Sequence, residues 1–142
     1  MTLSAVLNFV QLDVARNAIA LPLLLLAADL AQLRGRTGEV AGLLRRALDH
    51  DPNNIALWAR LAQCGRRGQL VPEAREAAER AMALASDAAA PLQALAHCAL
   101  ADVQAEEGDT AAAETSWREA LGKAPQLPQA LSGLGHLQLQ LG

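Results

Sequence analysis

One helical stripe that recurs at a fixed interval constrains this chain more than any other feature. Its clearest copy begins after Gly108, a helix breaker, and ends at Pro125, which lacks the N–H that a continuing helix needs. Between them, Ala113, Trp117 and Ala120 are spaced by four and three, which places them on one helical face. This small, large, small order predicts a helix that neighbours approach closely at the alanines while the indole fills the gap between them.

The same stripe occurs twice earlier in the chain. It lies 39 residues upstream and then a further 34 residues upstream, at Ala74, Ala78 and Ala81 and at Val40, Leu44 and Ala47. A step of 34 also relates Leu24 to Trp58 and Leu100 to Leu134. The five additional residues between the second and third copies fall most simply in 86–91. A helical unit at this period predicts an all-α protein of stacked repeats, because one unit cannot bury its apolar face alone.

The repeat resembles the tetratricopeptide repeat family, whose 34-residue helix–turn–helix units stack into a solenoid. The resemblance covers about residues 21–142 and rests on Trp58, Leu61, Ala62, Ala74, Ala81, Gly108, Ala113, Trp117, Ala120, Pro125, Leu134, Gly135 and Gly142. Val40 and Gly65 depart from the family pattern, which usually has a small and a large residue there. The resemblance implies a right-handed helical solenoid of antiparallel helix pairs. It would hold about 3.5 repeats, in units 21–54, 55–93, 94–127 and an incomplete 128–142.

Residues 1–20 precede the repeats and are expected to form a separate apolar helix, capped by Thr2 or Ser4. This helix is apolar on two sides, so it needs two partners. One partner would be the first repeat. Phe9 and Leu12, on the other side, are candidates for contact with a second copy of the chain, which would make a homodimer. A part of the full protein outside this sequence is another candidate partner. A simple cap over the end of the solenoid is the equal alternative.

Proline, asparagine and threonine set the expected helix boundaries after residue 20. Pro22 suits the first turn of a new helix, and Thr110 and either Asn53 or Asn54 are expected N-caps. The other expected helices and turns cover 39–50, 58–66, 72–84 and 92–107, with turns at 35–38 and 65–70. The last unit stops at Gly142, where the turn into its second helix is expected, which predicts that the chain is a fragment of a longer protein.

Charge and cysteine content narrow the classes of function. The formal net charge is −3, which argues against the basic face of a nucleic-acid-binding protein. Residues 1–80 hold ten arginines and eight acidic residues, whereas 81–142 hold two basic and seven acidic residues. This asymmetry would orient a charged partner, although solvated helix faces also account for it. Cys64 and Cys98 lack metal-ligand spacing and are expected as buried thiols in a reducing compartment.

The chain shows no secretory signal and no apolar run of membrane-spanning length. We therefore expect a cytoplasmic protein without membrane contact, and the Arg-rich, Lys-poor composition suggests a bacterial one. The histidines, His50, His97 and His136, lie outside known catalytic motifs, and the acidic cluster at 106–109 lacks a second ligand group. No catalytic, cofactor or metal site is expected, and the chain itself is not expected to be an enzyme.

The tetratricopeptide resemblance instead implies binding of a protein or peptide in a concave groove lined by the first helix of each unit. The expected lining residues are Leu25, Asp29, Leu33, Ala59, Arg60, Gln63, Arg67, Cys98, Asp102, Ala105, Ser132, His136 and Leu139. A charge gradient from Arg60 and Arg67 toward Asp102 would orient the ligand. The alternative function is an N-terminal arm, recruiting substrate or mediating oligomerisation, of an enzyme such as a glycosyltransferase, sulfotransferase or oxygenase with its catalytic domain beyond residue 142.

Two branches of the family are not expected from the groove residues. The chaperone-binding branch clamps a C-terminal carboxylate with lysines and asparagines, and the matching places here hold neither. The asparagine ladder of the O-linked N-acetylglucosamine transferase type is also missing, since its places hold Arg60, Ala99 and Gly133.

Overall fold

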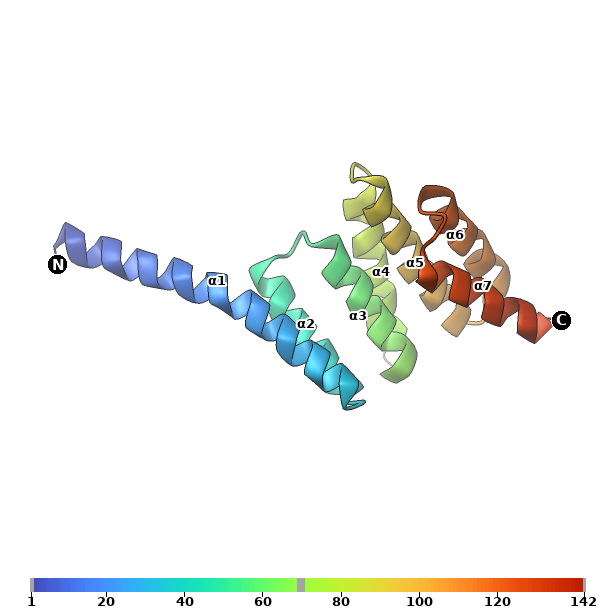
Figure 1. Ribbon diagram of the computed structural model, residues 1–142, viewed down its shortest axis with the longest axis horizontal. Helices are drawn as coiled ribbons and strands as arrows, with labels where there is room; N and C mark the ends of the chain where they lie inside the picture. Colours follow the sequence, from blue (N-terminus) through green and yellow to red (C-terminus); the bar gives the residue numbers. More distant parts are fainter. Residues whose placement is uncertain (1, 69–70, 142) are drawn as a thin grey trace. The chain divides into compact units, whose positions relative to one another are not determined.

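The protein is all-α in the part that the structure describes. The computed structural model describes the backbone of residues 2–68 and 71–141, and their side chains except those of 6–19, 65–68 and 71. The helices are α1 (Leu3–Leu33), α2 (Thr37–His50), α3 (Ile55–Gly68), α4 (Val71–Ala85), α5 (Ala90–Glu106), α6 (Thr110–Lys123) and α7 (Pro128–Leu141) (Figure 1). The chain divides into two compact units, unit 1 (Met1–Pro52) and unit 2 (Asn53–Gly142).

Unit 1 consists of α1 packed against α2, and α1 is longer than predicted. The expected break before Pro22 is wrong, because the helix continues through Pro22 to Leu33. Proline removes one backbone hydrogen bond and crowds the preceding turn, at a cost of about 3 kcal/mol in a helix interior. The flanking residues are nearly all alanine and leucine, which are the strongest helix formers, so the helical state is favoured on both sides of the proline.

The core of unit 1 lies between the second half of α1 and one face of α2. Among the described side chains of α1, the buried ones are Leu24, Ala28 and Ala31. The predicted α2 stripe is buried as expected, together with neighbours that extend it, at Val40, Ala41, Leu44, Ala47 and Leu48. Small residues on α1 allow the two helices to approach closely, while the leucines of α2 fill the space between them.

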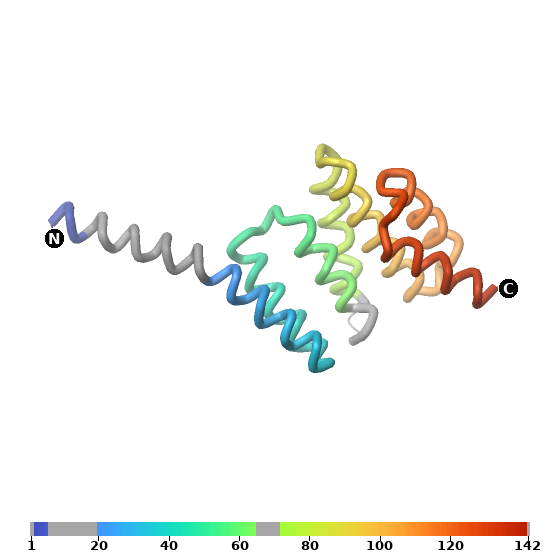
Figure 2. The backbone as a smooth tube through the Cα atoms, in the orientation of Figure 1, coloured from blue at the N-terminus to red at the C-terminus, as the bar shows by residue number. Residues whose placement is uncertain are grey.

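Unit 2 is a succession of packed helices joined by short connections. α3 packs with α4, and α5 packs with both of these and with α6, and α6 packs with α7. Figure 2 follows the chain through this alternation of direction. The alanine stripes of α4 and α6 are buried, so the predicted helix contacts at Ala74, Ala81, Ala113 and Ala120 are confirmed.

α1 and α5 end in the same type of turn. Gly35 and Gly108 lie 73 residues apart and both adopt positive φ, at 71° and 88°. The residue after each glycine donates its backbone N–H to a carbonyl five residues back, as Arg36 to Ala31 at 3.0 Å and Asp109 to Gln104 at 2.9 Å. This is the Schellman arrangement, which glycine adopts without strain because it has no Cβ. The predicted turns at these glycines are therefore confirmed, but the turn expected over 35–38 is shorter than predicted, because α2 begins at Thr37.

Some of the predicted N-cap residues are the ones that cap the helices in the structure. Thr2 caps α1 through a 3.2 Å bond from the Ala5 N–H, and Asn54 accepts from the Leu57 N–H at 3.2 Å. The predicted cap at Thr110 is wrong, because Asp109 accepts the Ala112 N–H at 3.1 Å. The charged carboxylate also interacts favourably with the positive end of the helix.

The predicted turn at 65–70 begins too early. α3 continues through Gly65 to Gly68, and the rest of the predicted turn, 69–70, lies outside the described residues. α5 starts at Ala90 with Pro91 in its first turn, a place where the missing N–H has no intrahelical partner.

Candidate partner-binding face

The first helices of the repeats in unit 2 are α3, α5 and α7. Gln63, Asp102 and His136 occupy the same repeat position on these helices, separated by steps of 39 and 34. α3 contacts α5, and α5 contacts α7, so the three positions follow one another across adjacent helices. We refer to the surface that they define, with Arg60, Ala105, Ser132 and Leu139 beside them, as the first-helix face.

Asp102, in the middle of the first-helix face, differs from Gln63 and His136 in its burial. Its side chain is buried, with only 5% of the residue surface exposed, whereas Gln63 is half-buried and His136 is exposed. Carboxylates are rarely buried in proteins unless they are paired or hydrogen-bonded. Asp102 is therefore held by the fold of α5 as a fixed polar group, unlike a solvated surface charge.

Two residues predicted to line the groove are part of the core. Cys98 is fully buried in one cluster with Trp117, Ala130 and neighbouring alanines, and Ala59 is also buried. Spacing along a helix gives the direction in which a side chain points but not how far it reaches toward solvent. These small side chains are covered by their larger neighbours. Cys98 exposes no surface, and Ala59 exposes 3% of its surface and has no polar side-chain group to offer a ligand, so both leave the candidate set.

The other predicted residues lie in several environments. Arg60 and Ala105 are half-buried on α3 and α5, and Ser132 and Leu139 are exposed on α7. In unit 1, Leu25 is half-buried while Asp29 and Leu33 are exposed on α1. The side chains of Phe9, Leu12 and Arg67 lie outside the described residues. The face that can be built from described neighbours is therefore that of α3, α5 and α7.

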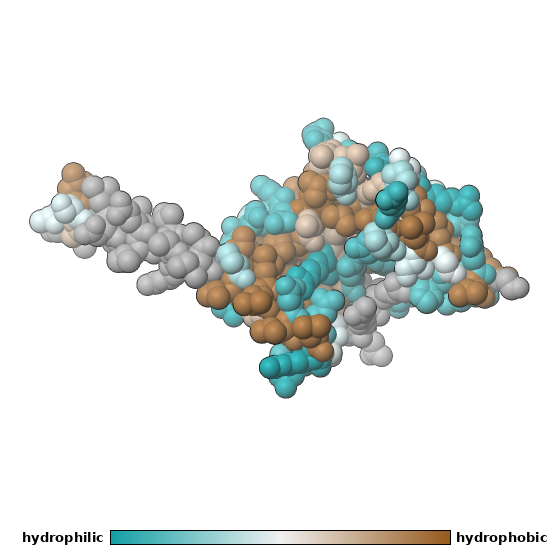
Figure 3. All heavy atoms as spheres, in the orientation of Figure 1, coloured by the Kyte–Doolittle hydropathy of each residue, from teal (hydrophilic) through white to brown (hydrophobic). Residues whose placement is uncertain are grey.

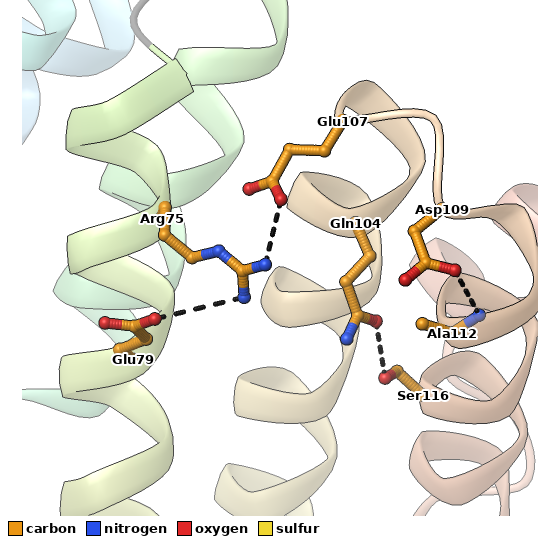
Figure 4. A network of polar contacts seen from close by, with 7 residues as sticks. All are labelled: Arg75, Glu79, Gln104, Glu107, Asp109, Ala112 and Ser116. Atoms are coloured by element: carbon orange, nitrogen blue, oxygen red, sulfur yellow. Dashed lines mark hydrogen bonds and ion pairs between the residues drawn. The ribbon is translucent and has the colours of Figure 1, made fainter.

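Polar contacts on another side of unit 2 hold α5 between its neighbours (Figure 4). Arg75 of α4 pairs with Glu107 at the end of α5 at 2.8 Å, and Glu79 lies 3.9 Å from the same guanidinium. On the opposite flank, the Ser116 hydroxyl of α6 donates to Gln104 Oε1 at 2.7 Å. These contacts link α4, α5 and α6 in order, which fixes the helix that carries Asp102.

The described residues place no three metal-ligating side chains of His, Cys, Asp or Glu together. Within the same part of the chain, none of the helices combines the length and the apolar character that crossing a membrane requires. Cys64 and Cys98 are buried, as the sequence predicted.

Comparison with known proteins identifies the repeat. Residues 21–64 match the sequence model described as tetratricopeptide repeat. The fold is similar to the TPR domain of Arabidopsis OM64, with a TM-score of 0.71, 14% identity, and coverage of 87% of this chain and 98% of that one. The chain has the tetratricopeptide repeat fold, and its residues 21–64 match the family's sequence model. The predicted all-α solenoid fold of antiparallel helix pairs is thereby confirmed.

Two other solved structures have a similar fold. The second TPR domain of human RPAP3, solved with the HSP70 peptide SGPTIEEVD, has a TM-score of 0.68 at 16% identity and covers 86% of this chain and 98% of its own. The N-terminal domain of STI-1 from C. elegans has a TM-score of 0.58 at 17% identity and covers 78% of this chain and 88% of its own. Among curated proteins, none matches the chain in sequence.

Proposed function

We propose that this tetratricopeptide repeat chain is a protein–protein interaction module that binds an extended peptide or partner segment on its first-helix face. The observation that carries the proposal is the row of Gln63, Asp102 and His136 at one repeat position on three successive helices. An amide, a carboxylate and an imidazole together supply both donors and acceptors, which is what the alternating N–H and C=O groups of an extended backbone require.

Charge on the first-helix face gives the ligand a direction. Arg60 on α3 favours an acidic group, while Asp102 on α5 favours a basic group or a cluster of N–H donors. Each exposed ionic contact contributes only about 0.2–1 kcal/mol. The charges therefore govern orientation and association rate more than affinity.

The ligand differs from the chaperone peptide seen with the RPAP3 domain. The helices α3, α5 and α7 contain neither lysine nor asparagine, the residue types with which the chaperone-binding branch clamps a terminal carboxylate. We expect an internal, extended segment as the ligand, because the polar row suits backbone groups and offers no such clamp.

A displayed library of random peptides, selected on the full chain, tests this proposal. Selected peptides are then titrated by fluorescence anisotropy against Gln63→Ala and His136→Ala. Each variant removes about one hydrogen bond, so affinity is expected to fall about three- to tenfold. Arg80→Ala, an exposed change on α4, is the matched control and is expected to bind as the wild type does. Equal binding by all four proteins would place the ligand on another surface.

The alternative of an enzyme arm receives no support from the comparisons, whose matches are to TPR domains. A cytoplasmic, bacterial setting stays a prediction. Self-association through the N-terminal helix at Phe9 and Leu12 also stays a prediction, and a described part of α1 bears on it.

A further inference from the structure

The second half of α1 exposes a continuous row of leucines, which we call the leucine stripe. Figure 3 shows apolar atoms gathered along this part of unit 1. The stripe consists of Leu23 (58% exposed), Leu26 (56%), Leu30 (49%) and Leu33 (85%). At 3.6 residues per turn it lies roughly 150° around the helix from the side that α2 covers, where Leu24 and Ala28 are buried. The fold of unit 1 therefore leaves the leucine stripe open.

The repeat register shows what this side of a first helix normally does. Steps of 34 and 39 place Leu23, Leu26 and Leu30 in the positions of Ala96, Ala99 and Val103 on α5 and of Ala130, Gly133 and Leu137 on α7. All six residues in unit 2 are buried. Ala96 packs with α3 and α4 residues, and Gly133 lies against the Trp117 indole of α6. This side is a helix-docking surface on α5 and α7, whereas on α1 it is exposed. On α3 the same positions hold Leu57 and Cys64, which are buried, and Arg60, which is half-buried.

Residue size separates the partner of α1 from a stacked repeat. On α5 and α7, the first two of these positions hold alanine or glycine, which let the preceding helices approach closely. On α1 they hold leucines, which would collide with a helix at that distance. Leucines spaced three, four and three apart are instead the pattern of a coiled-coil seam, in which each side chain inserts between four residues of the facing helix.

Flanking charges point to a second copy of the same helix. With Leu23 and Leu30 at a positions and Leu26 and Leu33 at d positions, Asp29 takes a g position and Arg34 an e position. Both are exposed. In a parallel, in-register pair, each g residue faces the e residue five places later on the other helix, so Asp29 of one copy meets Arg34 of the other. An antiparallel pair would separate these opposite charges.

The length of α1 also leaves room for a partner helix. At 1.5 Å per residue, its 31 residues extend roughly 46 Å, while the 14 residues of α2 extend roughly 21 Å. α2 therefore covers less than half of α1. The sequence continues the three-and-four spacing toward the N-terminus at Ile19, Leu12 and Phe9, with Arg16 as the single polar interruption, although these side chains lie outside the described residues.

We infer that the leucine stripe pairs with the same stripe of a second copy, forming a parallel, two-stranded coiled coil that joins two chains. This dimer contact is separate from the first-helix face and does not rest on peptide binding. It extends the predicted contact at Phe9 and Leu12 to a described surface and gives it an orientation.

Sedimentation equilibrium of the full chain tests the dimer. The wild type is expected at twice its 14.9 kDa mass. Leu26→Glu places two charges in the seam and is expected to weaken dimerisation by at least about 100-fold, because buried unpaired charges are strongly disfavoured. Leu139→Glu, the same change at an exposed leucine on α7, is expected to remain dimeric. Circular dichroism is expected to match the wild type in both variants, since both leucines are exposed in the single chain. Peptide affinity is expected to match the wild type in Leu26→Glu, because Leu26 lies outside the first-helix face.

Two further variants test the orientation. Leu33→Cys at a d position is expected to form an interchain disulfide under mild oxidation only if the helices are parallel and in register. Asp29→Arg and Arg34→Asp are each expected to weaken the dimer about two- to fivefold, and the double reversal to restore it. A wild-type monomer, or a dimer unaffected by Leu26→Glu, would overturn the inference. If the protein were dimeric but showed neither the cross-link nor the charge rescue, the parallel arrangement would be overturned. If its mass kept growing with concentration and Leu139→Glu abolished that growth, the assembly would be head-to-tail instead.

Discussion

The first helix of unit 1 and the last helix of unit 2 use the same three repeat positions in opposite ways. On α7 these positions are Ala130, Gly133 and Leu137, all buried against the cluster around Trp117. On α1 they are three leucines, each about half exposed or more. The family register is the same in both helices. What differs is the size of the side chains, and therefore the distance at which a neighbouring helix can pack.

This difference shows how one repeat unit is adapted either to a closely packed helix of the same unit or to a more distant helix. Where a preceding pair is present in the same unit, glycine and alanine make a shallow surface that a large residue such as Trp117 can fill. Where leucines project, that close packing is excluded, and a helix held at coiled-coil distance is favoured. Substitutions at these positions and at their neighbours test whether side-chain size sets the difference.

The largest effect is expected at Gly133. A Cβ there would lie 2.3 Å from Trp117 Cε2 and 2.5 Å from Cζ2, and the indole is buried and unable to swing away. Gly133→Ala is therefore expected to lower the free energy of unfolding by about 3 kcal/mol in urea denaturation. Gly135→Ala is the matched control on the same helix, because a Cβ added at Gly135 would have no heavy atom of another residue within 4 Å. It is expected to raise stability by about 0.5–1 kcal/mol through helix propensity. An equal loss of stability from both changes would show that the close contact with Trp117 is not the cause of the loss at Gly133.

Exchanging residue size between α5 and α1 is the next test. Ala99→Leu gives α5 the side chain that α1 has at this position, and overpacking is expected to destabilise the protein by about 1–3 kcal/mol. Leu26→Ala, the reverse change, is expected to alter monomer stability by less than about 0.5 kcal/mol, because Leu26 is exposed there. Thermal or urea unfolding at a concentration below the dimer dissociation constant measures both. A large loss from Leu26→Ala would mean that this leucine is already packed within its own chain.

A smaller effect is expected at the start of α6, the helix that carries Trp117. Asp109→Ala removes the side-chain acceptor of the Ala112 N–H and is expected to destabilise the protein by about 1 kcal/mol. Thr110→Ala, one residue later, is expected to change stability by less than about 0.5 kcal/mol. Urea denaturation that ranks the two variants in the reverse order would restore Thr110 as the cap.

The smallest effect is expected from the ion pair that joins α4 to α5. Glu107→Gln keeps the shape of the side chain but removes its charge, and the 2.8 Å contact with Arg75 is partly exposed. The expected loss is about 0.2–1 kcal/mol, and it should disappear in 1 M salt. Glu76→Gln on the exposed side of α4 is the control. A loss that persists in high salt would point to packing of the side chain.

Much of this fold was predictable because the repeat register appears directly in the sequence. Buried alanines at one helical spacing, together with the glycines that end α1 and α5, gave the helix pairs and their contacts. These features are local, since small residues on one stripe permit close packing and glycine permits positive φ. The capping position at Asp109 was missed because aspartate and threonine both cap helices, and sequence alone does not decide between adjacent candidates.

The errors came from residues whose effect depends on their neighbours. Pro22 was expected to begin a helix, but the surrounding helix formers carry α1 through it. That break divided the leucine stripe from the apolar positions before it, so the continuous three-and-four spacing went unrecognised. In the candidate site, Ala59 and Cys98 point in a plausible direction, but their burial depends on larger neighbours in the folded chain.

The central claim, that the open side of α1 is a helix-docking surface used by a second copy, is tested most directly by thiol labelling of Leu26→Cys. The natural cysteines are buried, so the new thiol is expected to react far faster than they do. Its labelling rate, followed by mass spectrometry, is expected to fall about tenfold or more as the protein is concentrated and the dimer forms. Leu139→Cys on α7, measured alongside, is expected to react at one rate throughout. A Leu26→Cys rate that is the same in dilute and concentrated protein would contradict the claim.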